Sequence, residues 1–332
     1  MSGRNKSVII ILSFFLVLTI VLTTTIGSTD ISIDITAKIL LSKFLLIEKT
    51  WTDGQEAIIN DIRFPRVLLG ALVGAALGTA GCAMQGLLKN PMADPYIIGI
   101  SSGAAVGACL AFVLLLPVQI ISFVFALIAI FIVYNISKTE GKVPVDTLLL
   151  AGIAVGSFLA AVTSLIIYTA GVPHQIIFWL MGGLWTADWE KVKISFVMII
   201  FGIIMLNRQA WNLNVMLLGE DQATYLGINV EHVKRYVLLF AVLITAAAVS
   251  VSGIIGFVGL IIPHIMRILV GPDHRILLPS SALAGAIFMV MADAMGRTVM
   301  KPVELPVGII TALFGVPFFI YLLRKRRKNI YA

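Results

Sequence analysis

Histidine and cysteine side chains, which often carry out chemistry in proteins, are few in this chain and are not grouped. The four histidines form neither an H-E-x-x-H pair nor a cysteine–histidine metal motif. They are His174, His232, His264 and His274. Cys82 and Cys109 lie in apolar runs, where cysteine packs as a small hydrophobic residue. The sequence therefore predicts no catalytic centre, no metal site and no disulfide framework.

Sequence motifs also give no support for nucleotide or nucleophile chemistry. A phosphate-binding loop needs G-x-x-x-x-G-K-[ST], and the one Gly-Lys pair, Gly141-Lys142, lacks these neighbours. The letters G-x-S-x-G occur once, at Gly99-Ile100-Ser101-Ser102-Gly103, but this segment lies in a predicted transmembrane span, whereas a nucleophile elbow joins a strand to a helix. We therefore predict that the chain is not an enzyme by itself and binds no cofactor directly.

The elements that carry these side chains are long and apolar. Of 332 residues, 59% are hydrophobic and only 12% are charged, and the mean hydropathy is +1.03. Soluble domains carry about 25% charged residues. Many stretches reach the roughly 20 apolar residues that a spanning helix needs, and the alternating segments of about ten residues typical of a membrane barrel are absent. The fold class is predicted to be an all-α integral membrane protein, surrounded by lipid.

About ten transmembrane helices are predicted, forming a single domain over 1–332. The predicted spans are 7–27, 67–88, 96–116, 118–137, 146–170, 192–207, 234–252, 257–271, 278–297 and 305–323. The basic tail 324–328 follows the last span and marks the inner side of the membrane. An even number of spans then places both termini in the cytoplasm and makes 208–233 the one sizeable cytoplasmic segment. The run 8–25 could pass for a signal peptide, but it is long for one and no A-x-A site follows.

The net charge of +7 could suggest a nucleic-acid partner. The basic residues cluster beside apolar spans, however, as cytoplasmic loops of membrane proteins do. We therefore predict no nucleic-acid binding.

Glycines mark two features of the predicted bundle. Gly70, Gly74 and Gly78 recur every four residues on one helix face, a spacing that lets helices pack closely in lipid. Gly253 and Gly256 interrupt an apolar stretch that is too long for one straight helix. The sequence predicts a short irregular segment there, between two spans.

Several collinear segments from about residue 62 to 322 resemble the FecCD-type permeases, the BtuC-like membrane subunits of ABC importers for iron–siderophores, haem and cobalamin. They are Arg63-Phe64-Pro65-Arg66, Met84-Gln85-Gly86, Lys89-Asn90-Pro91-Met92-Ala93-Asp94-Pro95, Ile98-Gly99-Ile100-Ser101-Ser102-Gly103-Ala104, the run 256–267, Asp273-His274-Arg275, Ala292-Asp293 and Glu304-Leu305-Pro306-Val307-Gly308. The resemblance implies the type II ABC importer permease architecture. It implies as partners a second permease subunit, identical or paralogous, two ABC ATPase subunits that bind ATP and Mg, and an extracytoplasmic substrate-binding protein.

The same resemblance implies a coupling role for the cytoplasmic segment, in which two short helices joined at a glycine fit the ATPase. The residues concerned are Gly219, Glu220, Asp221, Ala223, Leu226 and Gly227. The sequence suits this role: Asp221 can face solvent, Ala223 and Leu226 can face a partner, and Gly227 can end a helix. The alternative is an ordinary amphipathic loop helix.

On the outer side, the resemblance implies that Arg63, Arg66 and Arg297 meet acidic residues of the binding protein. The planar guanidinium suits this role because it pairs with a carboxylate at two points. The alternative is arginine at helix ends that extends to the membrane surface. Asp293 lies one turn before Arg297, and we predict that these two residues form an ion pair.

A chelate of this size needs a wide, apolar channel at the dimer interface. The side chains that could line it are Met84, Gln85, Asn90, Ser101 and Ser102, although these could equally pack or cap helices. Some relatives carry small hydroxyl residues in an inner-gate loop between the fourth and fifth spans. This chain reads Val143-Pro144-Val145-Asp146-Thr147 there and departs from that pattern.

We therefore predict a permease subunit of an ATP-driven ABC importer that moves a ferric siderophore across the cytoplasmic membrane of a bacterium. A haem or cobalamin permease of the same family remains an alternative. An ion-coupled secondary transporter is a rival of another class, and the scarcity of charges inside the predicted spans disfavours it.

Overall fold

The computed structural model describes residues 3–27, 29–43, 45–139, 141–171 and 173–330. Within these ranges the chain is helical, with a single isolated bridge between Thr139 and Lys142 in place of a sheet. Each of the ten predicted spans overlaps one long helix, so the predicted fold class is confirmed. These helices are α1 Gly3–Thr25, α4 Phe64–Leu87, α5 Ile100–Leu114, α6 Val118–Ser137, α7 Val145–Thr169, α9 Trp189–Arg208, α12 Val230–Ser252, α13 Val258–Val270, α14 His274–Thr298 and α15 Val307–Ile330.

Six helices in the described part of the chain are long and apolar enough to cross a membrane by length and composition. Three more are apolar but shorter: α5, α13 and the described part of α15. The tenth, α9, has 20 residues and carries Glu190, Lys191 and Lys193 in its first turns. The count of about ten therefore agrees with the sequence.

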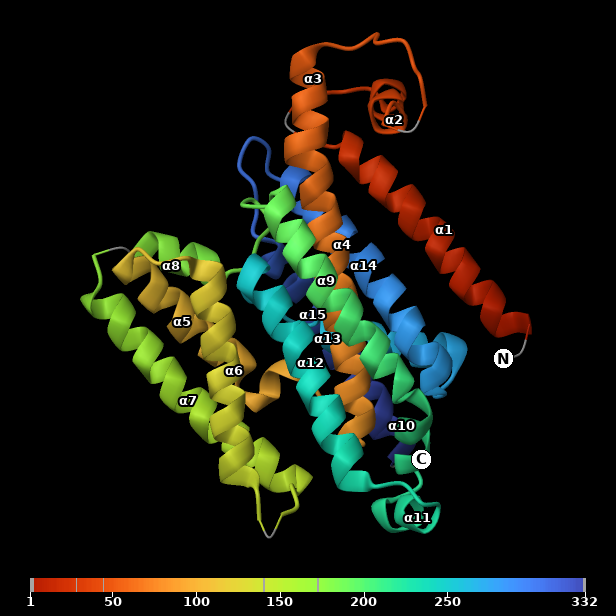
Figure 1. Cartoon of the computed structure of the whole chain (residues 1–332), viewed down its shortest axis with the longest axis vertical. Coiled ribbons are helices and arrows are strands. Elements are labelled where there is room, and N and C mark those ends of the chain that lie inside the picture. The colour runs from red at the N-terminus through yellow and green to blue at the C-terminus, as the bar shows by residue number, and fades with distance from the viewer. Residues whose placement is uncertain (1–2, 28, 44, 140, 172, 331–332) are drawn as a thin grey trace.

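Short helices lie at the two ends of the bundle. At one end are α2 (Ile33–Leu41), α3 (Asp53–Ala57) and the π-helix η1 (Ile58–Arg63), which runs directly into α4. At the other end are α10 (Ala210–Met216) and α11 (Glu220–Tyr225) (Figure 1). Two further short helices, η2 (Pro95–Ile98) and α8 (Pro173–Leu180), precede α5 and follow α7.

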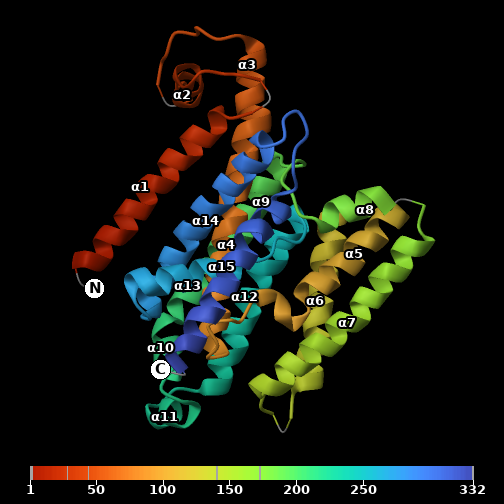
Figure 2. The same cartoon turned by 180° about the vertical axis from the view of Figure 1, so that it is seen from behind.

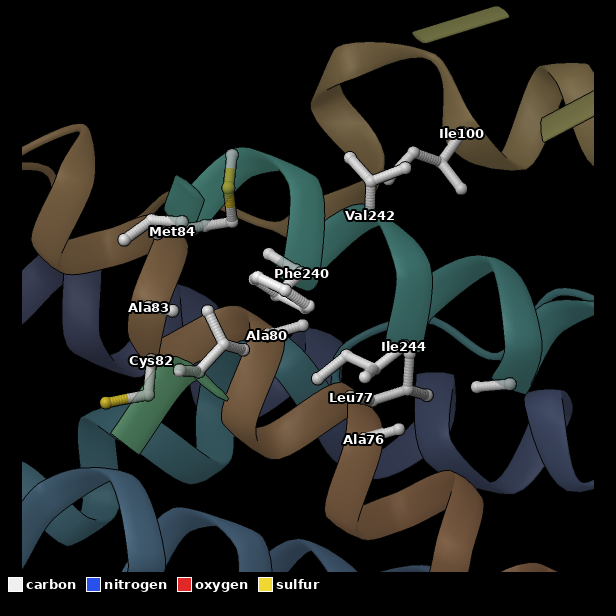
Figure 3. Packing of buried hydrophobic residues seen from close by; sticks show 14 of the residues in the cluster. Ala76, Leu77, Ala80, Cys82, Ala83, Met84, Ile100, Phe240, Val242 and Ile244 are labelled. Atoms are coloured by element: carbon white, nitrogen blue, oxygen red, sulfur yellow. The ribbon is translucent and has the colours of Figure 1, made fainter. Parts of the chain in front are cut away.

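Helix α4 is the centre of the bundle and packs against α12, α13 and α14. Ala76, Leu77 and Ala80 of α4 face Phe240 and Ile244 of α12 (Figure 3). On its other side α4 touches backbone: a Cβ added at Gly74 would lie 2.1 Å from the Gly285 carbonyl oxygen, and one at Gly81 would lie 1.9 Å from that of Gly259. The glycine spacing thus packs helices against one another, as the sequence predicts.

Helices α5, α6, α7 and α8 form a second group beside this bundle, and the front and rear views agree on this arrangement (Figures 1 and 2). Within the group, Gly103 and Gly107 of α5 lie against the backbone of α6. The group joins the central bundle mainly where α6 and α5 pack on α12. Large apolar side chains of α7 point away from the rest of the chain, among them Leu150 and Phe158.

The irregular segment predicted near Gly253 is present between α12 and α13. Gly253 and Phe257 both have positive φ angles, of 68° and 69°, which stop one helix and start the next in a new direction. The phenol of Tyr96 donates a hydrogen bond of 3.1 Å to the Ile255 carbonyl oxygen and so fixes this break against η2.

Candidate functional site

A buried charge network lies at the end of the bundle that carries α2 and α3. Arg66 binds the Asp293 carboxylate through Nε, at 3.1 and 3.2 Å, and through Nη2, at 2.9 Å. Its Nη1 lies 2.8 Å from Glu304, in the α14–α15 connection. Arg297 lies 3.0 Å from Asp293 as an ion pair, without the alignment of a hydrogen bond. The predicted pairing of Asp293 with Arg297 is confirmed, and Arg66 is a second partner that the sequence did not reveal.

Two arginines hold the end of α1 against this network. Arg63 Nη1 donates to the Thr25 carbonyl oxygen at 2.6 Å, and its Nη2 donates to that of Thr29. Arg297 donates to the carbonyl oxygens of Ile26, at 2.5 Å, and Thr23, at 3.2 Å. The last carbonyls of a helix have no partner within the helix, so these guanidinium groups bind carbonyls in the last turn of α1 and just beyond it, and fix this end to η1 and α14.

The three arginines predicted to dock a binding protein are therefore nearly enclosed, at 5%, 8% and 5% exposure for Arg63, Arg66 and Arg297. Their donors already bind carboxylates and carbonyls of their own chain. The accessible member of the network is Glu304, whose side chain is 43% exposed. A docking role for the arginines stays a prediction, and it would require a partner carboxylate to compete with these contacts.

The predicted coupling segment lies at the opposite end of the bundle as two short helices, α10 and α11, joined near Gly219. Gly219 and Gly227 have positive φ angles, of 125° and 82°, and Gly227 follows the end of α11 as predicted. Asp221 is exposed. The expectation that Ala223 faces a partner is wrong, because Ala223 is fully buried against its own chain.

Other apolar side chains of this segment are exposed and form a surface that a partner could contact. Leu226 is 64% exposed, as expected for a partner contact, and Tyr225 beside it is 90% exposed. Leu217 and Leu218, just before α11, are also exposed. Exposed apolar patches rimmed by polar groups are typical of protein contact sites. Sequence reasoning missed Tyr225 and Leu218, although a run of apolar residues within a cytoplasmic loop was a usable signal.

Asn214 of α10 ties the coupling segment to the bundle. Its Nδ2 donates to Asp273 at 2.6 Å, and its Oδ1 accepts from the His274 backbone N–H at 2.8 Å and lies 2.8 Å from Nδ1 of the ring. Asp273 is also the N-cap of α14. Hydrogen bonds from Arg275 hold the pKa of Asp273 well below its ordinary value. The sequence did not single out Asn214.

The residues predicted to line a pathway do not come together. Met84 is fully buried, beside α12 (Figure 3), and Gln85 is buried in hydrogen bonds with Leu260 and Arg267. The expectation that these two face a channel is therefore corrected: both are enclosed by helices of their own chain. Asn90 is exposed, whereas Ser101 and Ser102 are half-buried. A pathway role for these three stays a prediction.

An apolar groove lies on the chain surface between α8, the 253–257 break and α15. It is lined by Leu180, Met181, Ile254, Ile309, Leu313 and Pro317. Such a surface can take a large apolar ligand or another transmembrane helix. In the part of the chain that the structure describes, no group of three or more His, Cys, Asp or Glu side chains could hold a metal ion.

Comparisons with known proteins all find permeases or transporters of the ABC importer type. The profile of the FecCD transport family matches residues 15–325. The chain is 49% identical over 276 residues to the cobalamin import system permease BtuC of Halobacterium salinarum, covering 82% of this chain and 74% of that one. It is 36% identical to the hemin transport system permease HmuU of Yersinia pestis, over 99% of both chains. A solved inward-facing structure of a metal-chelate type ABC transporter superposes with a TM-score of 0.86 at 32% identity, covering 96% of this chain and 99% of that one.

Proposed function

Because this chain belongs to the FecCD transport family, it is a permease subunit of an ABC importer, and we propose that its cargo is a large metal chelate. The observation that carries the proposal is the family match across residues 15–325, together with a fold that superposes on a metal-chelate type transporter. A ferric siderophore is the cargo we put first.

Cobalamin is a second candidate, since a relative with 49% identity is named as a cobalamin permease. Haem is a third, since a relative that matches along the whole chain is named as a hemin permease. All three cargoes are large and partly apolar. The groove between α8 and α15 offers an apolar surface of the kind such a cargo needs.

Each end of the bundle offers a docking place for one of the partner proteins. An ABC ATPase, which binds ATP and Mg, docks on the exposed Leu218, Tyr225 and Leu226 near α11. An extracytoplasmic binding protein docks at the end that carries α2 and α3. A second permease subunit, identical or paralogous, completes the pore with a second ATPase. The start of α1 and the end of α15 both lie away from α2 and α3, which supports a cytoplasmic location for both termini (Figure 1).

Docking at the outer end acts through Arg66. Its bond to Glu304 is the accessible part of the charge network, so a carboxylate of the binding protein can replace Glu304 there while Asp293 stays bound. Arg63 and Arg297 hold α1 in place beneath this contact. Glu304→Gln should then strengthen docking, because it removes the competing charge. Weaker docking of this variant would mean that Glu304 itself contacts the partner.

The test of the proposed function uses the chain reconstituted in lipid with its ATPase, its second permease and its binding protein. ATP hydrolysis and uptake are measured while the binding protein is loaded in turn with a ferric siderophore, haemin or cyanocobalamin. We expect one loaded form to stimulate both activities, and that form identifies the cargo. Failure of the chain to form a complex with any ABC ATPase would refute the proposal.

A further inference from the structure

A lysine joins the coupling helix to the first turn of α12. Nζ of Lys234 lies 2.8 Å from Oε2 of Glu220, in α11, and 3.1 Å from Oε1 of Glu231, one turn earlier in α12. The Lys234 side chain is 6% exposed, whereas the two carboxylates are partly open to solvent. The cation is thus enclosed between two anions that belong to different elements.

The second oxygen of Glu231 continues this chain of contacts. Oε2 accepts a hydrogen bond of 3.2 Å from the backbone N–H of Val143. Val143 is itself buried in the main hydrophobic cluster and lies two residues before the start of α7. Nearby, Arg235 donates to the Gly141 carbonyl oxygen at 3.3 Å. Four groups therefore form one path: Glu220, Lys234, Glu231 and the backbone at Val143.

This path links two elements that belong to different parts of the molecule. Helix α11 packs on α10 and α12, whereas α7 belongs to the separate group α5–α8. A buried ion pair usually adds little net stability, because desolvation offsets the attraction, but removing one partner is costly. Such a contact resists separation of the elements that it joins, and this makes it suited to transmit a displacement.

We propose that Lys234 is a positioning residue that makes the inner end of α7 follow the movement of the coupling helix α11. The proposal rests on the proposed function, in which a partner ATPase moves α11. When Glu220 is displaced with α11, Lys234 carries the displacement to Glu231, and the Val143 hydrogen bond carries it to the connection before α7. The apolar face of α7 then shifts relative to the central bundle.

The chain offers a chemically matched control at its outer end. Lys49 also lies between two carboxylates, 2.6 Å from Asp53 and 2.7 Å from Glu56. All three residues belong to one short stretch, and the lysine is 48% exposed. Exposed pairs of this kind contribute little, and this one joins no separate elements. Lys49→Met removes the same chemistry without breaking the proposed path.

The test compares variants in the reconstituted complex, with the chelate that the wild-type complex takes up. For Lys234→Met we expect the complex to hydrolyse ATP while chelate uptake per ATP falls about tenfold, because removing one partner of a buried ion pair is costly. Glu231→Ala should cause a similar fall, and the double variant should fall no further, because both substitutions break one path. Lys49→Met should keep the wild-type ratio.

A spectroscopic measurement separates coupling from mere stability. Spin labels are attached to cysteines introduced at the exposed positions Lys142 and Lys301. The two native cysteines, Cys82 and Cys109, are buried and so do not compete for the label. In the otherwise wild-type complex, ATP should change the distance between the labels. In Lys234→Met the change should be lost although ATP is still hydrolysed.

The outcomes are distinct. Wild-type uptake per ATP together with an unchanged label response in Lys234→Met would overturn the path and leave the proposed function standing. A wild-type complex that takes up no chelate would refute the proposed function instead. Should Lys234→Met fail to fold, Glu231→Ala alone decides, since it leaves the Lys234–Glu220 pair intact and removes the contacts of Glu231 with Lys234 and with the Val143 backbone.

Discussion

The central bundle and the group α5–α8 differ in how much of their apolar stretches is buried within the chain. In the most apolar stretches of α4, α12 and α14, 83%, 72% and 61% of residues are buried within the chain, against 28% and 17% in α6 and α7. The central helices meet through backbone contacts and a buried charge network. The outer group instead presents large apolar side chains to its surroundings.

The difference shows which contacts this chain supplies and which it leaves to others. The central bundle pairs Arg66 and Arg297 with its own Asp293 and buries most of the residues in its apolar stretches, so its stability depends mainly on its own residues. The face of α7 is covered only when lipid or a second permease lies against it. Substitutions should therefore act on folding in the first region and on assembly in the second.

The largest effect is expected in the central charge network. Asp293→Asn removes the carboxylate that Arg66 and Arg297 share, and leaves Arg66 with Glu304 and Arg297 with the carbonyl oxygens of Thr23 and Ile26. Removing one partner of a buried ion pair lowers the stability of the folded state by about 3–5 kcal/mol. The loss is measured from the thermal unfolding of the subunit in detergent. Asp34→Asn breaks an exposed pair with Lys38 as a control and should cost less than about 0.5 kcal/mol. An equal loss of stability in Asp293→Asn and Asp34→Asn would show that water reaches the charge network of Arg66, Asp293 and Arg297.

A matched glycine pair gives the next largest effect. In Gly81→Ala the new Cβ meets the Gly259 carbonyl oxygen at 1.9 Å, which is backbone and cannot turn aside, so overpacking should cost about 1–3 kcal/mol. In Gly156→Ala, on α7, the nearest atom is Ser102 Oγ at 3.5 Å, and the better helix propensity should make the change neutral or about 1 kcal/mol stabilising. The thermal unfolding midpoint of each variant is compared with that of the wild type. A midpoint that falls in both variants, or rises in both, would contradict the difference in packing between α4 and α7.

Polar substitutions on the outer face of α7 test assembly. Leu150→Asn and Phe158→Asn alter side chains that point away from the chain, so the thermal midpoint of the isolated subunit should change little. Pairing with the second permease should weaken by at least about tenfold, which is about 1.4 kcal/mol, measured by dissociation on dilution in detergent. Unchanged pairing would mean that lipid covers this face.

The smallest effect is expected at the inner start of α14. Asp273→Ala removes an N-cap and the Asn214 contact and should cost about 1 kcal/mol at pH 7. Because the folded state lowers the pKa of Asp273, its contribution is present above the ordinary value of about 3.9 and is lost as the pH falls below it. The difference between wild type and variant in unfolding midpoint should therefore shrink from pH 7 to pH 3. A constant difference would argue against the charged cap.

Sequence patterns predicted the helices well and the side-chain partners poorly. The ten spans, the break at Gly253 and the end of α11 at Gly227 follow from apolar length and glycine placement, which are local properties of the chain. The same reasoning placed Ala223 at a partner surface and Met84 on a channel, and both are buried. Local patterns give the period of a helix but not which neighbour covers each face.

The sequence by itself determined that this protein crosses a membrane through about ten helices, and its motifs indicated the family, because apolar length and short motifs are written in consecutive residues. Only the tertiary structure decided that Arg66 and Arg297 share Asp293, that Asn214 holds Asp273, and that Lys234 joins Glu220 to Glu231. The partners Arg66 and Asp293 are 227 positions apart in the sequence. A charge buried in an apolar bundle must find its partner wherever packing brings one within reach, and no local pattern records that distance.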